Sequence, residues 1–449
     1  MAIDLTPEER VKAVEVNTWF GEHIKKAKKW SVYTSGHGIY IQDSEGKEFI
    51  DAHSGQFCAS LGHGNKEVIK AIQEQLDVIQ YPEAVRSDAA LRACQRVGEL
   101  APGDLNRVYL GLSGSDANEA AVSVARSFYK TQGKDNSMII ARWHSYHGQS
   151  RTAAGLTHAG KRLHGSDLAT ANHGVHHVFA PYCYRCDYGL EYPSCDIRCA
   201  RAVEDVIRFM GPGNVAAVMG EPILGAGGNI EPPDEYWPLM REICDRHGIL
   251  LILDEVVTGW GKTGKLFACE HWGVVPDIMV CGKGMSSAYL PVSAVIVREH
   301  VYTALNATWP YYGHTHSFYP AGAAAVVATL DIIMRDKLYE NAGTIGAYMK
   351  ERLEAIAKKS KIVGKVHGKG LLLGMEIVED KATKVPWARA ANTIRKGCAD
   401  KGVLIHANGL GGSILSIVPP MIITRDEADK ICDVLEEVIQ TAPRRTPRR

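Results

Sequence analysis

No stretch of this sequence is apolar for long enough to cross a membrane, which takes about 18 or more consecutive apolar residues. The first twenty residues, MAIDLTPEERVKAVEVNTWF, are charged and contain no apolar core of a secretion signal. A dominant charge is also missing, because 51 lysines and arginines balance 51 aspartates and glutamates. These absences argue against a membrane protein and against a nucleic acid or an anionic membrane as partner. We therefore expect a soluble, cytoplasmic protein.

Cysteine is not scarce, since the chain of 449 residues has 11 of them. Without a secretion signal, we expect free thiols rather than a disulfide framework. Cys183, Cys186, Cys195 and Cys199 form one cluster, whose C-x2-C-x8-C-x3-C spacing could hold a metal ion through four thiolates. The alternative is a compact surface loop whose cysteines stay reduced, and we favour no metal.

Helix and strand patterns alternate from Pro82 to about Tyr319, which indicates an α/β fold with a largely parallel sheet. Short apolar runs predict strands at Val108–Leu112, Met138–Ala141, Val215–Met219, Ile249–Leu253, Ile278–Cys281 and Val292–Val297. Helices are predicted at Asp234–Arg246, which follows two prolines, and at Ala321–Met334. A chain of this length suits a two-domain α/β enzyme.

Three segments follow from these patterns. Residues 1–60 are expected to form an N-terminal arm and a hairpin over Gly38–Asp51, where apolar and polar residues alternate around Ser-Glu-Gly. Residues 61–325 are expected to form the large domain, and residues 326–449 a smaller α/β domain containing the strand GLLLGMEIV. The Pro- and Arg-rich tail APRRTPRR is expected to be a disordered end.

An acidic residue and a lysine follow two of the buried strands. Asp254 comes directly after Ile249–Leu253, and Lys283 lies between two glycines after Ile278–Cys281. Open α/β sheets bind ligands outside the carboxyl ends of their strands. Pyridoxal 5'-phosphate (PLP) needs a lysine amine for a Schiff base and a carboxylate beside its pyridine nitrogen. From these residues alone, both side chains could equally be ordinary loop residues.

The surrounding motif is longer and more specific. Asp-Glu-x-x-Thr-Gly-x-Gly-Lys-Thr-Gly runs from Asp254 to Gly264, Pro-Asp-Ile precedes Gly-Lys-Gly at 282–284, and Leu290-Pro291 follows. This pattern resembles the class III aminotransferases, which are fold-type I PLP enzymes. The resemblance extends from about Ile39 to near Gln440 and is closest to 2,2-dialkylglycine decarboxylase and the ω-aminotransferases. It implies a homodimer with a large, mixed or parallel-sheet cofactor domain and a smaller α/β domain.

The resemblance implies that Lys283 holds PLP as a Schiff base and moves the proton during catalysis, while Asp254 holds the positive charge of the ring nitrogen. The expected reaction transfers an amino group from an amine or amino acid to a 2-oxo acid. A racemase, epimerase, decarboxylase or ammonia-lyase of the same family is the alternative. No strand is followed by the G-x-G-x-x-G of a dinucleotide-binding oxidoreductase.

Residues 113–120, SGSDANEA, follow a predicted strand and open a helix, whose N-terminal N–H groups attract phosphate. They match the phosphate-binding turn of the family, so that Gly114 and Ser115 are the expected phosphate donors. Tyr146-His147-Gly148 matches the family's aromatic-x-Gly element. The resemblance therefore implies that Tyr146 stacks on the pyridine ring and that His147 also lies at the cofactor.

The same resemblance places Glu221 near the pyridine side of the cofactor and Val256 against the ring face opposite the tyrosine. Val257 is a departure, since many relatives have glutamine there to bind the cofactor's phenolic oxygen. Thr315 aligns with a threonine that reaches the phosphate of the partner subunit. If this holds, two chains build each site.

The substrate side departs most from the family. Ser416 occupies the position of the arginine that usually binds the substrate α-carboxylate, and a serine cannot replace that bidentate contact. Gln56 matches a residue that contacts the carboxylate in dialkylglycine decarboxylase. Trp19, in the arm, could touch substrate. Ala226 stands where a related lactam racemase has an acidic residue, which argues against racemisation by that route.

Three explanations of the missing arginine remain open at this point. Another cation could bind the carboxylate, with Lys29, Arg86 and Arg151 as candidates. The substrate could be an amine without an α-carboxylate. The reaction could also proceed without a 2-oxo acid.

Overall fold

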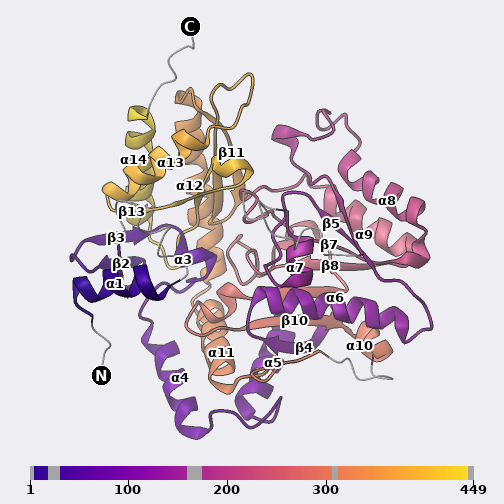
Figure 1. Cartoon of the computed structure of the whole chain (residues 1–449). Coiled ribbons are helices and arrows are strands. Elements are labelled where there is room, and N and C mark those ends of the chain that lie inside the picture. The colour runs from indigo at the N-terminus through magenta and orange to yellow at the C-terminus, as the bar shows by residue number, and fades with distance from the viewer. Residues whose placement is uncertain (1–4, 19–30, 159–173, 306–311, 443–449) are drawn as a thin grey trace.

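The computed structural model describes residues 5–18, 31–158, 174–305 and 312–442. Figure 1 shows a large region around a wide central sheet, beside a smaller region in which the N-terminal hairpin lies next to the C-terminal helices. Two residues considered for substrate binding, Trp19 and Lys29, lie outside the described residues. No helix in the described ranges is both long and apolar enough to span a membrane.

The central sheet has seven strands in the order β4-β10-β9-β8-β7-β5-β6. The strands from β9 to β6 pair in parallel, whereas β10 pairs antiparallel with both β4 and β9. Their bounds are β4 (Leu105–Gly111), β5 (Met138–Arg142), β6 (Val175–Val178), β7 (Val215–Gly220), β8 (Leu250–Asp254), β9 (Ile278–Cys281) and β10 (Ser293–Arg298). The predicted mixed, mainly parallel α/β sheet is confirmed.

Successive residues of these strands pack on opposite faces of the sheet. Ile252 and Val280 belong to the apolar cluster under α6 (Gly114–Lys130). Leu251 and Met279 belong to the cluster that also contains the apolar face of α9 (Tyr236–His247). Because side chains alternate along a strand, a sheet covered on both faces needs apolar residues at every position. This is why its strands appear in the sequence as continuous apolar runs.

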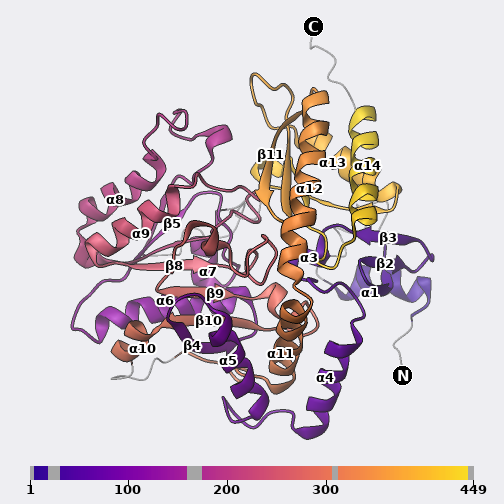
Figure 2. The same cartoon turned by 180° about the vertical axis from the view of Figure 1, so that it is seen from behind.

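Other helices surround this sheet or connect it to the rest of the chain. They are α3 (Ser54–Phe57), α4 (Lys66–Val78), α5 (Asp88–Leu100), α7 (Arg151–Leu156), α8 (Arg198–Met210), α10 (Glu299–Leu305) and α11 (Pro320–Arg335). Seen from behind, α11 continues toward α12 (Leu338–Lys359) at the junction of the two regions (Figure 2), and the two helices contact one another. The junction is therefore built partly from a single stretch of chain.

The smaller region contains two four-stranded sheets, β1-β2-β3-β13 and β11-β12-β15-β14. The strands are β1 (Tyr33–His37), β2 (Tyr40–Asp43), β3 (Glu48–Asp51), β11 (Val363–Lys369), β12 (Leu372–Ile377), β13 (Val403–Leu404), β14 (His406–Asn408) and β15 (Ile414–Ile417). Helices α13 (Ala388–Asp400) and α14 (Arg425–Thr441) pack on each other, and α1 (Pro7–Asn17) begins with a capping box at Thr6. Antiparallel pairing of β2 with β3 confirms the predicted hairpin, and β13 adds to it in parallel.

One strand of the central sheet was not predicted. Strand β6 has the sequence VHHV, and only its last residue is buried. Among the described strands it lies at the edge of the sheet, and its two histidines are partly exposed. A strand without an apolar run or a clear alternation gives no periodic signal in the sequence. The first and last residues of the other strands of the central sheet differ from the predicted ones by up to three positions.

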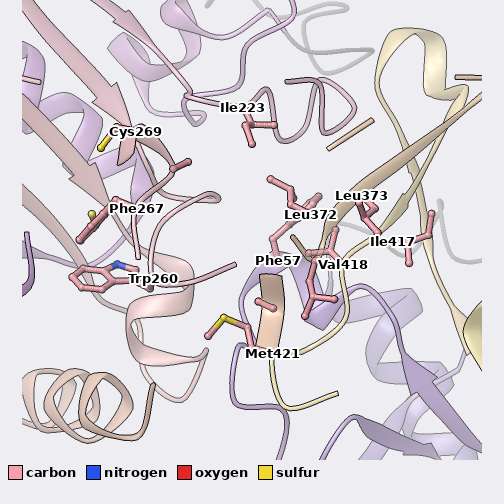
Figure 3. Packing of buried hydrophobic residues seen from close by; sticks show 14 of the residues in the cluster. Phe57, Ile223, Trp260, Phe267, Cys269, Leu372, Leu373, Ile417, Val418 and Met421 are labelled. Carbon is pink, nitrogen blue, oxygen red and sulfur yellow. The ribbon is translucent and has the colours of Figure 1, made fainter. Parts of the chain in front are cut away.

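Buried apolar side chains join the two regions at the level of the central sheet (Figure 3). Phe57 lies near Leu372 and Val418 of the smaller region, and all three are buried. On the other side, Trp260 and Phe267 pack edge to face with ring centroids 4.8 Å apart. Each fully buried side chain of this kind contributes about 1.5–3 kcal/mol through removal of apolar surface from water. The packing of Phe57 near Leu372 and Val418 holds residues 53–58 against the smaller region.

Candidate active site

A cavity of about 430 Å³ lies at the carboxyl ends of the parallel strands. Four strands deliver side chains to it, since Tyr146 follows β5, Glu221 follows β7, Asp254 ends β8 and Lys283 follows β9. The opposite wall comes from residues 53–58 and from β14 in the smaller region. The cavity therefore lies between the two regions, and each region supplies one side.

Asp254 is buried at one end of the cavity and has three polar partners. Its Oδ2 accepts a hydrogen bond from Asn118 Nδ2 at 2.9 Å and lies 2.7 Å from His147 Nδ1, while its Oδ1 accepts from Val256 N at 3.0 Å. Burial alone would raise the pKa of Asp254, but His147, Asn118 and Val256 together lower it below its usual value. Asp254 thus keeps its negative charge at neutral pH.

Lys283 lines the same cavity and begins a short 3-10 turn, Lys283–Ser286. Its backbone adopts a left-handed conformation, with φ of 43°, which is uncommon for residues other than glycine. Among the described residues, its amine has no hydrogen-bond partner. The amine and the Asp254 carboxylate therefore face one cavity, as the sequence motif predicted.

The N-terminus of α6 forms another part of the wall. Ser113 caps the helix by accepting a hydrogen bond from Asp116 N, and Gly114 and Ser115 follow in its first turn. A side chain at Gly148, whose φ is 124°, would place its Cβ 2.3 Å from Ser115 Oγ. Glycine at position 148 permits this close approach. The first turn of α6 lines the cavity through residues 113–115, and helix N-termini attract anions.

Glu221 fixes the loop that carries Tyr146. Its Oε1 accepts a hydrogen bond from Tyr146 N at 3.0 Å, and its Oε2 accepts from Gly225 N at 2.8 Å. Burial, with a contribution from the charge of Asp254, raises the pKa of Glu221. Val256 and Val257 also line the cavity, so the departure from glutamine at position 257 leaves an apolar side chain on its wall.

The structure brings together most of the predicted site residues but not all of them. Gln56 lines the cavity, whereas Ser416 is completely buried and accepts a hydrogen bond from Asn229 Nδ2 at 2.8 Å, outside the lining. Thr315 is exposed and does not line the cavity of its own chain. The alternative cations Arg86 and Arg151 are exposed and likewise absent from the lining.

Sequence reasoning missed several residues of this cavity. Asn118, which holds Asp254, lies one helical turn after Gly114, and this spacing could have indicated it. His53, His406 and Asn408 line the wall from the smaller region. No motif marks these three residues, because distant segments bring them to the site.

The four clustered cysteines lie elsewhere, around a separate small cavity near the start of α8. They are free thiols. Within the described ranges, no three or more histidine, cysteine, aspartate or glutamate residues are grouped so that they could hold a metal ion.

A family model described as "Aminotransferase class-III" matches residues 24–439. The chain is 34% identical over 423 residues to diaminobutyrate–2-oxoglutarate transaminase of Halomonas elongata, with 91% of this chain and 90% of that protein covered. It is 33% identical over 406 residues to leucine/methionine racemase of Thermococcus litoralis, covering 89% and 88%. A solved (S)-enantioselective omega-transaminase from Thermomicrobium roseum superposes with a TM-score of 0.90 at 30% identity, covering 98% of this chain and 99% of that one.

The fold is that of a fold-type I PLP-dependent transferase. Within that class, the chain belongs to the class III aminotransferases and is a PLP-dependent aminotransferase.

The residues around the cavity fit this cofactor. A buried, ionised carboxylate at one end suits a protonated ring nitrogen, and the open first turn of α6 suits a phosphate. Lys283 lines the same cavity, and its amine is the kind of group that PLP enzymes require.

Proposed function

We propose that Lys283 binds the cofactor covalently and then carries the proton between the substrate Cα and the cofactor. Bound PLP supplies an electron sink for the bond that breaks at Cα. The observation that supports this role most strongly is that the Lys283 amine and the ionised Asp254 carboxylate face one cavity at neighbouring strand ends. Within that cavity, Lys283 is the only lysine or arginine among the described lining residues.

Asp254 is proposed to hold the ring nitrogen in its protonated form. His147 and Asn118 both bind Asp254 Oδ2, so they orient the carboxylate and keep it ionised. The positive ring nitrogen would in turn compensate the buried negative charge. His147 is therefore a positioning residue in this proposal, since it acts through Asp254.

The other proposed contacts with the cofactor come from residues that line the cavity. Gly114 and Ser115 would hold the phosphate at the N-terminus of α6. Tyr146 and Val256 would enclose the ring, with Glu221 fixing the backbone of Tyr146. Gln56, which also lines the cavity, would contact substrate.

The reaction is proposed to exchange an amine or amino acid against a 2-oxo acid. Adding an amine donor to the cofactor-loaded protein should convert the absorbance of the pyridoxal form to that of the pyridoxamine form. Pyruvate or 2-oxoglutarate should reverse the change. Inversion, decarboxylation or elimination of the donor without this conversion would instead favour a racemase, decarboxylase or lyase.

A homodimer is the proposed active unit, with Thr315 of one chain bound to the phosphate in its partner. Thr315 is exposed and outside the cavity of its own chain, and apolar Val78 and Leu91 are exposed on α4 and α5. Because a hydrogen bond to a charged group contributes about 1.5–3 kcal/mol, Thr315→Ala should weaken cofactor binding by about 10–100-fold. Titration of the cofactor with absorbance detection measures this.

Thr393→Ala is the matched control, since Thr393 is exposed on α13 and bonds only to the backbone of its own helix. Sedimentation should show that both variants remain dimers. A wild-type protein that is fully active as a monomer would contradict the proposal, as would unchanged cofactor affinity in Thr315→Ala.

A further inference from the structure

Asn408 has two buried polar atoms that point to a ligand. Its Oδ1 and Nδ2 are shielded from solvent and have no hydrogen-bond partner within the part of the chain that the structure describes. The residue ends β14 and lines the cavity. Buried amides are normally hydrogen-bonded, because an unpaired donor or acceptor is costly. A rotation of the Asn408 side chain would turn this unpaired amide toward a molecule bound in the cavity.

The backbone around Asn408 is held firmly. Asn408 pairs with Ile414 across the antiparallel strands β14 and β15, and Gly409 N donates a hydrogen bond to Ala226 O at 3.1 Å. Ala226 lines the same cavity. The amide is thus carried by a strand rather than by a free loop, so its position is defined before a substrate binds.

The described lining of the cavity offers few charged groups to a substrate. The lining has one lysine, Lys283, and two carboxylates, Glu221 and Asp254, and both carboxylates accept hydrogen bonds from the protein. Burial, reinforced by the adjacent His406, lowers the pKa of His53 to about 4, so that His53 is neutral at pH 7. A substrate carboxylate bound here would meet no arginine among the described lining residues, and a buried charge without a partner is unfavourable.

We infer that Asn408 selects the amino donor by binding a neutral polar group, a carboxamide or a hydroxyl, at the end remote from the reacting amine. The inference rests on the proposed aminotransferase reaction. A side-chain amide offers two N–H donors and one acceptor oxygen. A substrate carboxamide can donate to the Asn408 oxygen and accept from its N–H group at the same time, and a substrate hydroxyl can do either. A carboxylate leaves Oδ1 unpaired, and an apolar end leaves both atoms unpaired.

Three donors of similar shape test this, namely 4-aminobutanamide, 4-aminobutanoate and 4-methylpentan-1-amine. The rate of conversion of the loaded enzyme's absorbance gives kcat/KM for each donor without any 2-oxo acid. The wild type should prefer the carboxamide by at least about 10-fold, because a site built for hydrogen bonds rejects analogues that cannot form them. Asn408→Leu should remove this preference and favour the apolar donor.

Asn392→Leu is the matched control, because Asn392 is exposed on α13 and binds only its own helix backbone. It should retain the wild-type order of donors. Asn408→Asp provides a second variant of nearly unchanged size, which should prefer 1,4-diaminobutane over the carboxamide by about 10-fold, since its carboxylate pairs with the distal ammonium. An order of donors that is the same in the wild type and in both Asn408 variants would overturn the inference.

Thermal unfolding without any donor gives an independent readout. Asn408→Leu replaces an unpaired buried amide with an apolar group of similar size, so its Tm should equal or exceed that of the wild type. A fall of several degrees would assign Asn408 a structural role instead.

The proposed reaction and the proposed role of Asn408 can be contradicted separately. If no amine converts the absorbance of the loaded enzyme, the aminotransferase reaction is contradicted. If amines convert it but the rate does not depend on the donor's remote group, only the role of Asn408 is contradicted.

Discussion

Replacement of Lys283 by alanine should reduce turnover by at least about 10⁴-fold, which is roughly 5.5 kcal/mol of transition-state stabilisation. The variant loses the amine that anchors the cofactor and moves the proton, and no other lysine or arginine among the described residues lines the cavity. Single-turnover conversion with an amine donor measures the loss. Borohydride reduction followed by peptide mass analysis should find the cofactor attached to residue 283 in the wild type only.

Lys265→Ala is the appropriate control, because Lys265 is exposed and lies in the loop between β8 and β9. It should remain fully active. Thermal unfolding of the cofactor-free proteins separates a loss of chemistry from a loss of fold. Retention of more than a few per cent of activity by Lys283→Ala would refute the proposed role of the lysine.

The second large effect is expected for Asp254→Asn, which keeps the size of the side chain and removes its charge. The change should lower kcat by about 10²–10⁴-fold, because a preorganised buried charge is worth several kcal/mol to a transition state. The new amide would also bring an N–H group near the donors Asn118 Nδ2 and Val256 N. KM for the amine donor should change much less than kcat, since Asp254 lies at the cofactor end.

A cofactor analogue methylated on its ring nitrogen distinguishes the charge of Asp254 from a structural role. Its nitrogen is permanently positive, so it should restore part of the activity of Asp254→Asn. Asp135→Asn serves as control, because the Asp135 side chain is 88% exposed and pairs only with Lys130 on the surface. Failure of the analogue, together with normal cofactor binding, would falsify the electrostatic role.

The sequence predicted the parts of the site that lie at strand ends. Asp254, Glu221 and Lys283 follow runs of apolar residues, and parallel strands bring their carboxyl ends to one edge of the sheet. The turn at Ser113–Ser115 was predictable for a similar reason, because a cap, a glycine and a helix start are local features. Such features depend on neighbours in sequence, so a linear pattern records them.

The wall facing Lys283 from the smaller region was not predictable in the same way. Gln56 was found only through resemblance, whereas His53, His406 and Asn408 were not found. These residues reach the cavity because β13 pairs with β3 and joins segments about 350 positions apart. Pairing over such separations leaves no local periodicity in the sequence.

Ser416 illustrates the limit of reasoning by position. The sequence has a serine at the position where the resemblance places the family's arginine. The structure adds that Ser416 is buried against Asn229 and that the lining on this side includes Asn408. Whether a residue of this segment faces the substrate depends on how β14 pairs with β15 and on the length of the side chain.

The sequence by itself therefore determined the fold class and the family, and it predicted the acid–lysine pair, because apolar periodicity and contiguous motifs encode local structure and strand ends. Only the tertiary structure decided the hydrogen bonds that keep Asp254 ionised and the unpaired amide of Asn408 on the substrate wall. Both depend on distances and burial between segments far apart in the chain. Such distances are set when the two regions pack together, since burial and hydrogen bonding act in space and not along the sequence.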